Sequence, residues 1–431
     1  MKVAITTLGC KVNQYDTASV ATELIRAGHA VEDFGPGADV YIVNSCTVTD
    51  RADAESRQLV RRAKRWNPAA RVILTGCYAA ANPDGAAAVA EVDYVVSLGQ
   101  RAELLGAVDG TLNGRRIHVD NLRKAEGAPL LGADVFAGRT RAFLKVQDGC
   151  DLFCTFCIVP WSRGRSRSVP PRAILDELDR LAARGFQEVV LTGIHLGGYG
   201  HDLSPRIGLA ELVEMIAERR PLPRVRLSSI DPPEVSARLL DLMRQSDVIC
   251  PHLHMPIQSG DDTVLRRMRR RYDAALVREV ATEIRRRLPE AGLGTDVIAG
   301  FPGETEEQFA NTVILLETHP FTYLHAFPFS RRTGTTAAKQ FGHLPKRDIA
   351  ARAQRLRMLG ERKRREFAAR FVGAQLRVLV EAGDDGRGCV GYARNYVRVA
   401  VAGNAIAGNR EVSVRVHGVR RDCAEGVVDA A

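Results

Sequence analysis

Long hydrophobic runs are missing from this chain of 431 residues. No stretch of about 18 consecutive apolar residues occurs, and the first residues, KVAITTL, lack the apolar core of a secretion signal. A disulfide framework is also missing, because the nine cysteines are odd in number and six of them fall into two groups of three. We therefore expect a cytoplasmic protein in a reducing compartment, with no membrane partner.

Positive charge is in excess. Lys and Arg number 61 against 51 Asp and Glu, which gives a net charge of +10. Such a field attracts polyanions, including nucleic acids. The dense Arg runs at 266–271 and 361–365 are equally compatible with solvated helix faces, so charge alone does not identify a partner.

Three thiols crowd into one short segment. Cys150, Cys154 and Cys157 are spaced CxxxCxxC on a stretch without helical or strand period, directly after a predicted buried strand at 143–146. Thiols on such a loop can converge on one metal centre. A structural zinc site usually has a fourth ligand at similar spacing, whereas the next histidine here is His195. The spacing favours an iron site with one open position over buried thiols or an incomplete zinc knuckle.

Three more cysteines follow predicted strands near the start of the chain. Residues 1–132 alternate apolar strands with helical patterns, which indicates a doubly wound parallel α/β domain. The carboxyl ends of parallel strands meet at one sheet edge, where such sheets bind ligands. The sequence therefore predicts a second three-thiolate site, formed by Cys10, Cys46 and Cys77.

Six strand patterns alternate with amphipathic helical patterns in residues 133–368. Six units are fewer than the eight of a closed TIM barrel, so we predict a partial (βα)6 barrel whose reactive face is the carboxyl end of its strands. Beyond the sixth strand, Arg332 could reach an anionic group or simply be solvated. The polar candidates for cofactor binding at the strand ends are Thr192, Gly193, Ser228, Gln258 and Asp296.

Residues 369–431 follow a long basic helical pattern and consist of short alternating strands with glycine turns. This pattern is typical of a small antiparallel β-barrel. Cations and aromatic residues alternate in it, as in small RNA-binding barrels. We take Arg394, Tyr396 and Arg398 as candidate RNA contacts.

Taken together, these motifs resemble those of the radical S-adenosylmethionine (SAM) methylthiotransferase family over essentially the whole chain. The resemblance implies an N-terminal methylthiotransferase domain at 1–132, a radical SAM barrel at 133–368 and a TRAM RNA-binding domain at 369–431. The matching segments are GCKVNQYD, VNSCTV, GCYA, CDLFCTFC, LTGIHLGGYG, HLHMPIQSGDDTVLRRMRRRY, TDVIAGFPGET and FSRRTGT.

The family resemblance also implies the cofactors. A 4Fe-4S cluster on Cys150, Cys154 and Cys157 would chelate SAM at its open iron, with Phe156 beside it, and a second 4Fe-4S cluster would bind the other three cysteines. An electron would cleave SAM to methionine and a 5′-deoxyadenosyl radical, while the second cluster would present a sulfur methylated by another SAM. No catalytic side chain beyond the cluster ligands is implied.

The segment GCKVN is similar to the corresponding segment in one branch of the family. That branch adds a methylthio group to C2 of N6-threonylcarbamoyladenosine at tRNA position 37. Sibling branches act on dimethylallyladenosine in tRNA or on an aspartate of a ribosomal protein, and these remain alternatives. A non-catalytic, metal-containing RNA-binding protein is a further one. The expected partners are the tRNA anticodon arm, a small reducing protein such as flavodoxin or ferredoxin, and a sulfur donor. We expect the protein itself to be a monomer.

Overall fold

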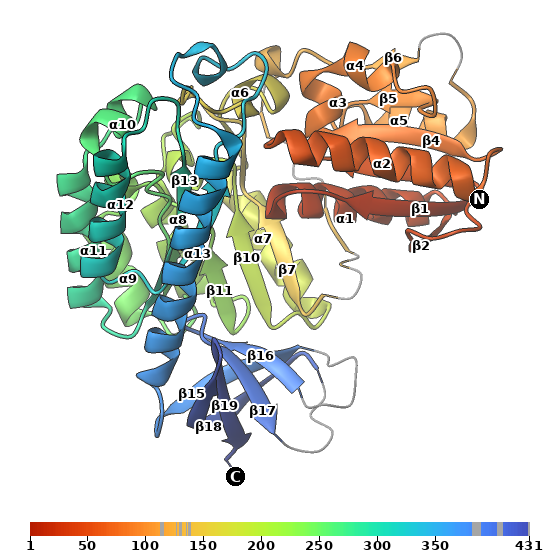
Figure 1. The fold of residues 1–431 in the computed structure, drawn as a ribbon. Helices are drawn as coiled ribbons and strands as arrows, with labels where there is room; N and C mark the ends of the chain where they lie inside the picture. The colour runs from red at the N-terminus through yellow and green to blue at the C-terminus, as the bar shows by residue number, and fades with distance from the viewer. Residues whose placement is uncertain are drawn as a thin grey trace.

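The computed structural model describes residues 1–112, 116–125, 127–128, 132–134, 136, 139–381, 389–402 and 408–429. An N-terminal sheet lies beside the upper part of a central half-barrel, and a small barrel lies below it (Figure 1). Among the helices of these described residues, none combines the length and apolar character needed to cross a bilayer.

The N-terminal sheet has six parallel strands in the order β2-β1-β3-β4-β5-β6. Its strands are β1 (Lys2–Thr7), β2 (Ala30–Asp33), β3 (Val40–Ser45), β4 (Arg71–Gly76), β5 (Tyr94–Val96) and β6 (Ile117–His118). Its helices are α1 (Lys11–Arg26), α2 (Asp50–Trp66), α3 (Cys77–Ala81), α4 (Pro83–Ala87) and α5 (Arg101–Asp109). The predicted parallel α/β domain is confirmed.

Apolar side chains along β3 point alternately to the two faces of the sheet, and helices cover both faces. Tyr41 and Val43 pack with Val60 of α2 on one face of the sheet, whereas Val40 and Ile42 pack on the other face, against α1 and α5. Successive side chains of a strand point to opposite faces, so a fully apolar strand must be covered on both. The short edge strand β2 escaped prediction because its sequence, AVED, is mostly exposed.

The central unit has the six predicted strands, arranged as two three-stranded parallel sheets, β7-β10-β11 and β12-β13-β14. Isolated bridges from Val225 to Ile249 and from Ser229 to His254 join the sheets into one half-barrel. Its strands are β7 (Arg141–Lys145), β10 (Glu188–Thr192), β11 (Arg224–Leu227), β12 (His252–His254), β13 (Gly292–Ala299) and β14 (Tyr323–Pro328). The predicted partial (βα)6 barrel is confirmed.

Helices cover the outside of the half-barrel (Figure 1), and a small antiparallel hairpin flanks Cys150, Cys154 and Cys157 in the sequence. The helices are α6 (Val159–Ser162), α7 (Pro171–Ala183), α8 (Leu209–Arg219), α9 (Ala237–Gln245), α10 (Asp262–Arg267), α11 (Ala274–Arg287), α12 (Glu306–Thr318) and the long basic α13 (Lys346–Ala369). The hairpin pairs β8 (Gln147–Asp148) with β9 (Arg167–Ser168).

The C-terminal unit is a closed five-stranded barrel in the order β15-β16-β17-β19-β18. The predicted small barrel is confirmed, with one difference: β17 and β19 pair in parallel, while the other pairs are antiparallel. Its strands are β15 (Gln375–Glu381), β16 (Cys389–Ala393), β17 (Arg398–Ala402), β18 (Arg410–Arg420) and β19 (Cys423–Val428).

Candidate active site and its two thiol triads

The loop triad, Cys150, Cys154 and Cys157, lies between β8 and α6 at the carboxyl end of the half-barrel strands. Burial, followed by the charge of neighbouring sulfurs in the triad, raises the pKa of Cys150 and Cys157 to about 12. The sulfurs of the triad therefore lie within electrostatic reach of one another, and the thiols of Cys150 and Cys157 remain protonated unless a cation replaces their protons. Soft thiolate donors in this number suit an iron-sulfur cluster.

The auxiliary triad, Cys10, Cys46 and Cys77, forms at the carboxyl edge of the N-terminal sheet. Cys46 and Cys77 directly follow β3 and β4, and Cys10 follows β1 after Leu8 and Gly9; the three strands are neighbours in that sheet. The sheet order reverses between β1 and β3, and open α/β sheets bind ligands at such a switch point. Burial, and then the charges of the other two sulfurs, raise the pKa of Cys46 to about 12. The structure thus brings these cysteines together as predicted.

Two glycines permit this crowding. Gly9 has φ of +97°, and a Cβ there would lie 2.9 Å from the sulfur of Cys46. Gly76 has φ of +88°, and its Cβ would lie 2.5 Å from the carbonyl oxygen of Ser45. L-amino acids with side chains rarely adopt such angles, and neither position has space for a methyl group. The two glycines let the strand ends approach each other closely.

Asn13 connects the strand ends that carry the auxiliary triad. Its side-chain amide donates to the carbonyl oxygens of Leu8 and Ser45 at 2.8 and 2.9 Å. Its side-chain oxygen accepts from the Cys77 thiol at 3.5 Å and from the guanidinium of Arg163. Our sequence reasoning missed both polar residues, although Asn13 belongs to the segment GCKVN.

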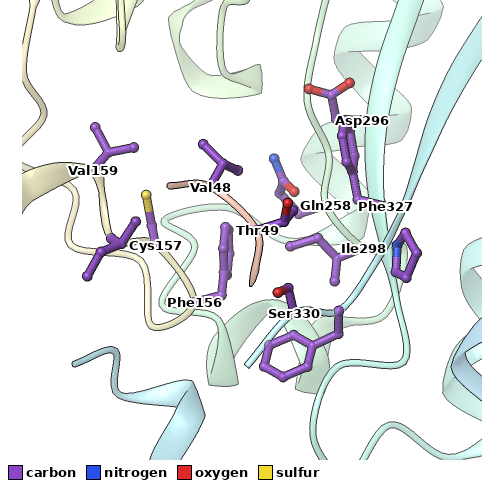
Figure 2. Close-up of a pocket in the computed structure, with 13 residues that line it drawn as sticks. Val48, Thr49, Phe156, Cys157, Val159, Gln258, Asp296, Ile298, Phe327 and Ser330 are labelled. Carbon is purple, nitrogen blue, oxygen red and sulfur yellow. The ribbon is translucent and has the colours of Figure 1, made fainter. Parts of the chain in front are cut away.

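A cavity of about 190 Å³ lies between the loop triad and the half-barrel. In Figure 2, Phe156 and Cys157 lie on one side, Gln258 and Asp296 lie on the other, and Thr49 of the N-terminal domain lies between them. Three of the predicted cofactor-binding residues therefore line one cavity together with a triad cysteine. The lining residues missed from the sequence include Val48, Thr49, Ile298, Phe327 and Ser330.

Two histidines fix the carboxylate of Asp296. His254 Nε2 lies 3.0 Å and His325 Nδ1 lies 3.1 Å from the same oxygen, Oδ1. Burial alone would raise the pKa of Asp296, but the two histidines outweigh it and hold the pKa below its usual range. Ligand atoms of the three residues lie within 4.8 Å of one another, so they also have the spacing to share a cation. The signal in the sequence was the alternation HLH in a buried strand.

The other predicted cofactor residues lie at neighbouring strand ends, apart from the residues that line the cavity. Gly193 lies close to Gln147, since a Cβ on Gly193 would approach its Oε1 to 2.8 Å. Thr192 is buried, and its carbonyl oxygen accepts from Val146 at 2.9 Å. The buried hydroxyl of Ser228 has no hydrogen-bond partner among the described residues, as expected of a group that meets a ligand. Their assignment to cofactor binding stays a prediction.

Arg332 meets anionic groups of the protein itself. Its guanidinium donates to Thr47 at 2.6 Å and to Asp53 at 2.7 Å, and it also pairs with Asp50. Of the two alternatives, reaching an anionic group is met here by two carboxylates of the protein, whereas simple solvation is wrong for this buried side chain. The contacts tie the loop after β14 to the segment containing Thr49, which lines the cavity.

The three candidate RNA contacts differ in environment. Arg394 donates to the carbonyl oxygens of Pro223 and Asp247, so it joins the C-terminal barrel to the half-barrel. Tyr396 packs in an aromatic cluster, with its ring centroid 4.4 Å from that of His252. Arg398 is exposed and lines a second cavity, of about 180 Å³.

The half-barrel, with the loop triad at the carboxyl end of its strands, places this chain in the class of radical SAM proteins. Residues 144–316 match the Radical SAM superfamily, and residues 2–97 match Uncharacterized protein family UPF0004. A solved radical S-adenosylmethionine methyltransferase, TsrM from Kitasatospora setae, shares the fold with a TM-score of 0.56 at 16% identity, over 89% of this chain and 79% of that chain.

Two bacterial relatives are closer in sequence. Threonylcarbamoyladenosine tRNA methylthiotransferase MtaB from Bacillus subtilis is 39% identical over 96% of this chain and 93% of the relative. The protein of the same name from Aquifex aeolicus is 40% identical over 88% of this chain and 93% of the relative. The chain belongs to the MtaB family of radical SAM methylthiotransferases.

Proposed function

We propose that this protein adds a methylthio group to C2 of N6-threonylcarbamoyladenosine at position 37 of tRNA. The observation that carries the proposal is a cavity bounded by both the radical SAM loop and the N-terminal domain, with a separate thiol triad in each unit. A simple radical SAM reaction needs one triad. The second triad fits a reaction in which a sulfur-containing group is also supplied.

The donor sets fit two 4Fe-4S clusters. Each triad offers three soft sulfur ligands, and a buried guanidinium donates an N–H to one sulfur of each triad. When bound, SAM and the two clusters supply the radical, the methyl group and the sulfur that side chains cannot provide. We assign the loop triad to the SAM-binding cluster and the auxiliary triad to the second cluster.

The cavity residues then bind SAM and exclude water. Phe156 provides an apolar wall beside Cys157, while Gln258 and Asp296 provide polar groups on the opposite wall. Because two histidines hold one oxygen of Asp296, the carboxylate presents a fixed acceptor to a ligand amine or hydroxyl. Ser228, whose hydroxyl has no partner in the part of the chain that the structure describes, and its neighbours Thr192 and Gly193 complete the proposed contacts.

The second cavity extends the proposed RNA surface. We call it the junction cavity, because it is lined by Tyr323 and His325 of β14, Arg364 of α13, and Tyr396 and Arg398 of the C-terminal barrel. Aromatic faces and cations are the groups that bind unpaired nucleotides. His325 also contacts Asp296 of the first cavity, so a loop of RNA lying along β14 would meet both. The anticodon arm is a partner of this kind.

The remaining assignments complete the proposal. We assign residues 1–132 to the methylthiotransferase unit, 133–368 to the radical SAM unit and 369–431 to the RNA-binding TRAM unit. The enzyme would act on tRNA in the cytoplasm as a monomer. A small reducing protein such as flavodoxin or ferredoxin would supply electrons, and a separate donor would supply sulfur.

Mass spectrometry of tRNA nucleosides tests the proposal. In a strain lacking this protein, we expect the 2-methylthio derivative of threonylcarbamoyladenosine to disappear and to return on complementation. Loss of the dimethylallyladenosine derivative, or of methylthio-aspartate in a ribosomal protein, would assign the protein to a sibling branch. A purified, reconstituted protein that forms no 5′-deoxyadenosine from SAM would instead favour a non-catalytic RNA-binding role.

A further inference from the structure

Each thiol triad is contacted by one buried arginine. Arg163 Nε donates to the sulfur of Cys77 at 3.3 Å, and Arg270 Nη1 donates to the sulfur of Cys154 at 3.2 Å. Only 5% of the Arg163 side chain and 6% of the Arg270 side chain are exposed. A buried guanidinium is costly unless every arm meets a partner, so the two sulfur contacts call for an explanation.

Arg163 reaches across the boundary between two units. It lies just beyond α6, near the loop triad, yet its sulfur partner belongs to the auxiliary triad. Its Nη1 lies 2.6 Å from Asp16 of α1 and 3.4 Å from Asp148 of β8, and Lys145 lies 2.7 Å from the same Asp16. Two cations thus face two carboxylates, and these ion pairs orient Nε toward the sulfur.

Arg270 is held in an equivalent way. Its Nη2 forms an ion pair of 2.6 Å with Asp231, and its Nε donates to the hydroxyl of Tyr272 at 2.9 Å. That hydroxyl in turn donates to the carbonyl oxygen of Pro256 at 3.0 Å. The planar guanidinium therefore has one orientation, in which Nη1 is directed at Cys154.

In both places a carboxylate already balances the arginine charge. The net effect at the sulfur is therefore mainly that of an oriented N–H donor, rather than of an uncompensated positive charge. Hydrogen bonds to ligand sulfurs are one of the factors that set the reduction potential of an iron-sulfur cluster. They stabilise the reduced state more, because it carries more negative charge, and they raise the potential.

We propose that Arg163 and Arg270 are positioning residues that raise the reduction potentials of two different clusters, Arg163 that of the auxiliary triad and Arg270 that of the loop triad. The inference rests on the proposed function, since it requires a cluster on each triad. It goes further by assigning to each cluster one residue of this chain that adjusts its potential independently of the other.

A potentiometric titration of the reconstituted full-length protein, monitored by electron paramagnetic resonance, measures the reduction potential of each cluster and tests the inference. Lysine can retain the ion pair with Asp16 or Asp231 but has no second arm for the sulfur. In Arg163→Lys, the reduced-to-oxidised ratio of the auxiliary cluster at a fixed potential should fall at least tenfold, or about 59 mV for one electron. Arg270→Lys should do the same to the loop cluster, which is identified by its spectral response to SAM.

Matched controls separate this role from a structural one. Arg167 is buried near Arg163 and donates to its carbonyl oxygen, while Arg267 packs over Phe301. Arg167→Lys and Arg267→Lys should leave both potentials unchanged. If a lysine variant does not fold, the glutamine variant at the same position replaces it, with the same direction of shift expected.

The test is decided by which cluster changes its reduction potential in which variant. Unchanged potentials, or a shift of both clusters in either variant, would overturn the inference, because a general loosening of the structure does not select one cluster. Iron analysis of the wild type keeps the proposed function separate. Iron for one cluster alone would refute both the second cluster and the role of Arg163, whereas iron for two clusters with unmoved potentials would refute this inference only.

Discussion

Glu188 and Arg226 form an ion pair, with Oε1 and Nε 2.8 Å apart, that is buried at the amino end of the half-barrel. The other carboxylate oxygen lies 2.7 Å from Arg224 Nε. The two guanidinium groups then donate to carbonyl oxygens of the C-terminal barrel, at Tyr392 and Arg394. One carboxylate therefore orients two arginines of the half-barrel that contact the C-terminal barrel, the unit to which we assign RNA binding.

Glu188→Gln should weaken this docking in a pH-dependent way. Burial alone would raise the pKa of Glu188, but Arg226 and Arg224 outweigh it and lower the pKa to about 2. The stabilisation is therefore complete above the ordinary pKa of about 4.3 and is lost as the pH falls toward 2. At pH 7 the substitution should cost on the order of 3 kcal/mol in the free energy of unfolding.

Urea unfolding of both proteins at pH 7 and pH 3 measures this effect, and the difference should shrink at the lower pH. Glu283→Gln is the control, because Glu283 pairs with Arg286 and Arg287 on the exposed surface of α11 and should contribute little. The same gap between Glu188→Gln and the wild type at both pH values would contradict the assignment.

The strands and the auxiliary triad could be predicted because their signals are local. Apolar period and strand ends are visible in the sequence, and parallel topology then brings Cys10, Cys46 and Cys77 together. The arginine contacts could not be predicted. Arg163 and Cys77 are 86 residues apart, and Arg332 is 285 residues from Thr47. The sequence pattern around a charged side chain does not show which distant residue it contacts. These contacts therefore became visible only in the three-dimensional structure.

Substitutions in the two triads should separate two steps of the proposed reaction. Cys150→Ala removes a ligand of the loop triad and should abolish SAM cleavage. Cys46→Ala leaves the loop triad intact and should still form 5′-deoxyadenosine, but no methylthiolated tRNA. Chromatography of the nucleoside and mass spectrometry of the tRNA measure the two products, with Cys250→Ala, a buried thiol outside both triads, as control. Equal loss of SAM cleavage in both triad variants would contradict separate roles.

Arg332→Ala should loosen the N-terminal domain where it borders the cavity to which we assign SAM binding. The change removes the contacts to Thr47, Asp50 and Asp53 and leaves two carboxylates without their cation. Amide hydrogen exchange in residues 47–53 should become at least tenfold faster, and SAM cleavage without methylthiolation should increase. Arg331→Ala, which removes the neighbouring exposed arginine, is the control. Unchanged exchange in Arg332→Ala would show that other contacts hold this segment.

Arg398→Ala should weaken RNA binding more than removal of an equal charge elsewhere on the same barrel. Arg398 lines the junction cavity beside Tyr396, whereas Arg420 lies at the end of β18 with a side chain 77% exposed. Because a cation that binds phosphate is removed from the cavity, affinity for an unmodified anticodon stem-loop should fall several-fold, and the slope of log affinity against log salt concentration should decrease by about 1.

The control, Arg420→Ala, lowers the net charge equally but should change the affinity for RNA little. Binding measured between about 50 and 200 mM salt compares the two variants. Equal reductions in affinity would mean that the field of the whole barrel binds RNA, without a specific contribution from the junction cavity.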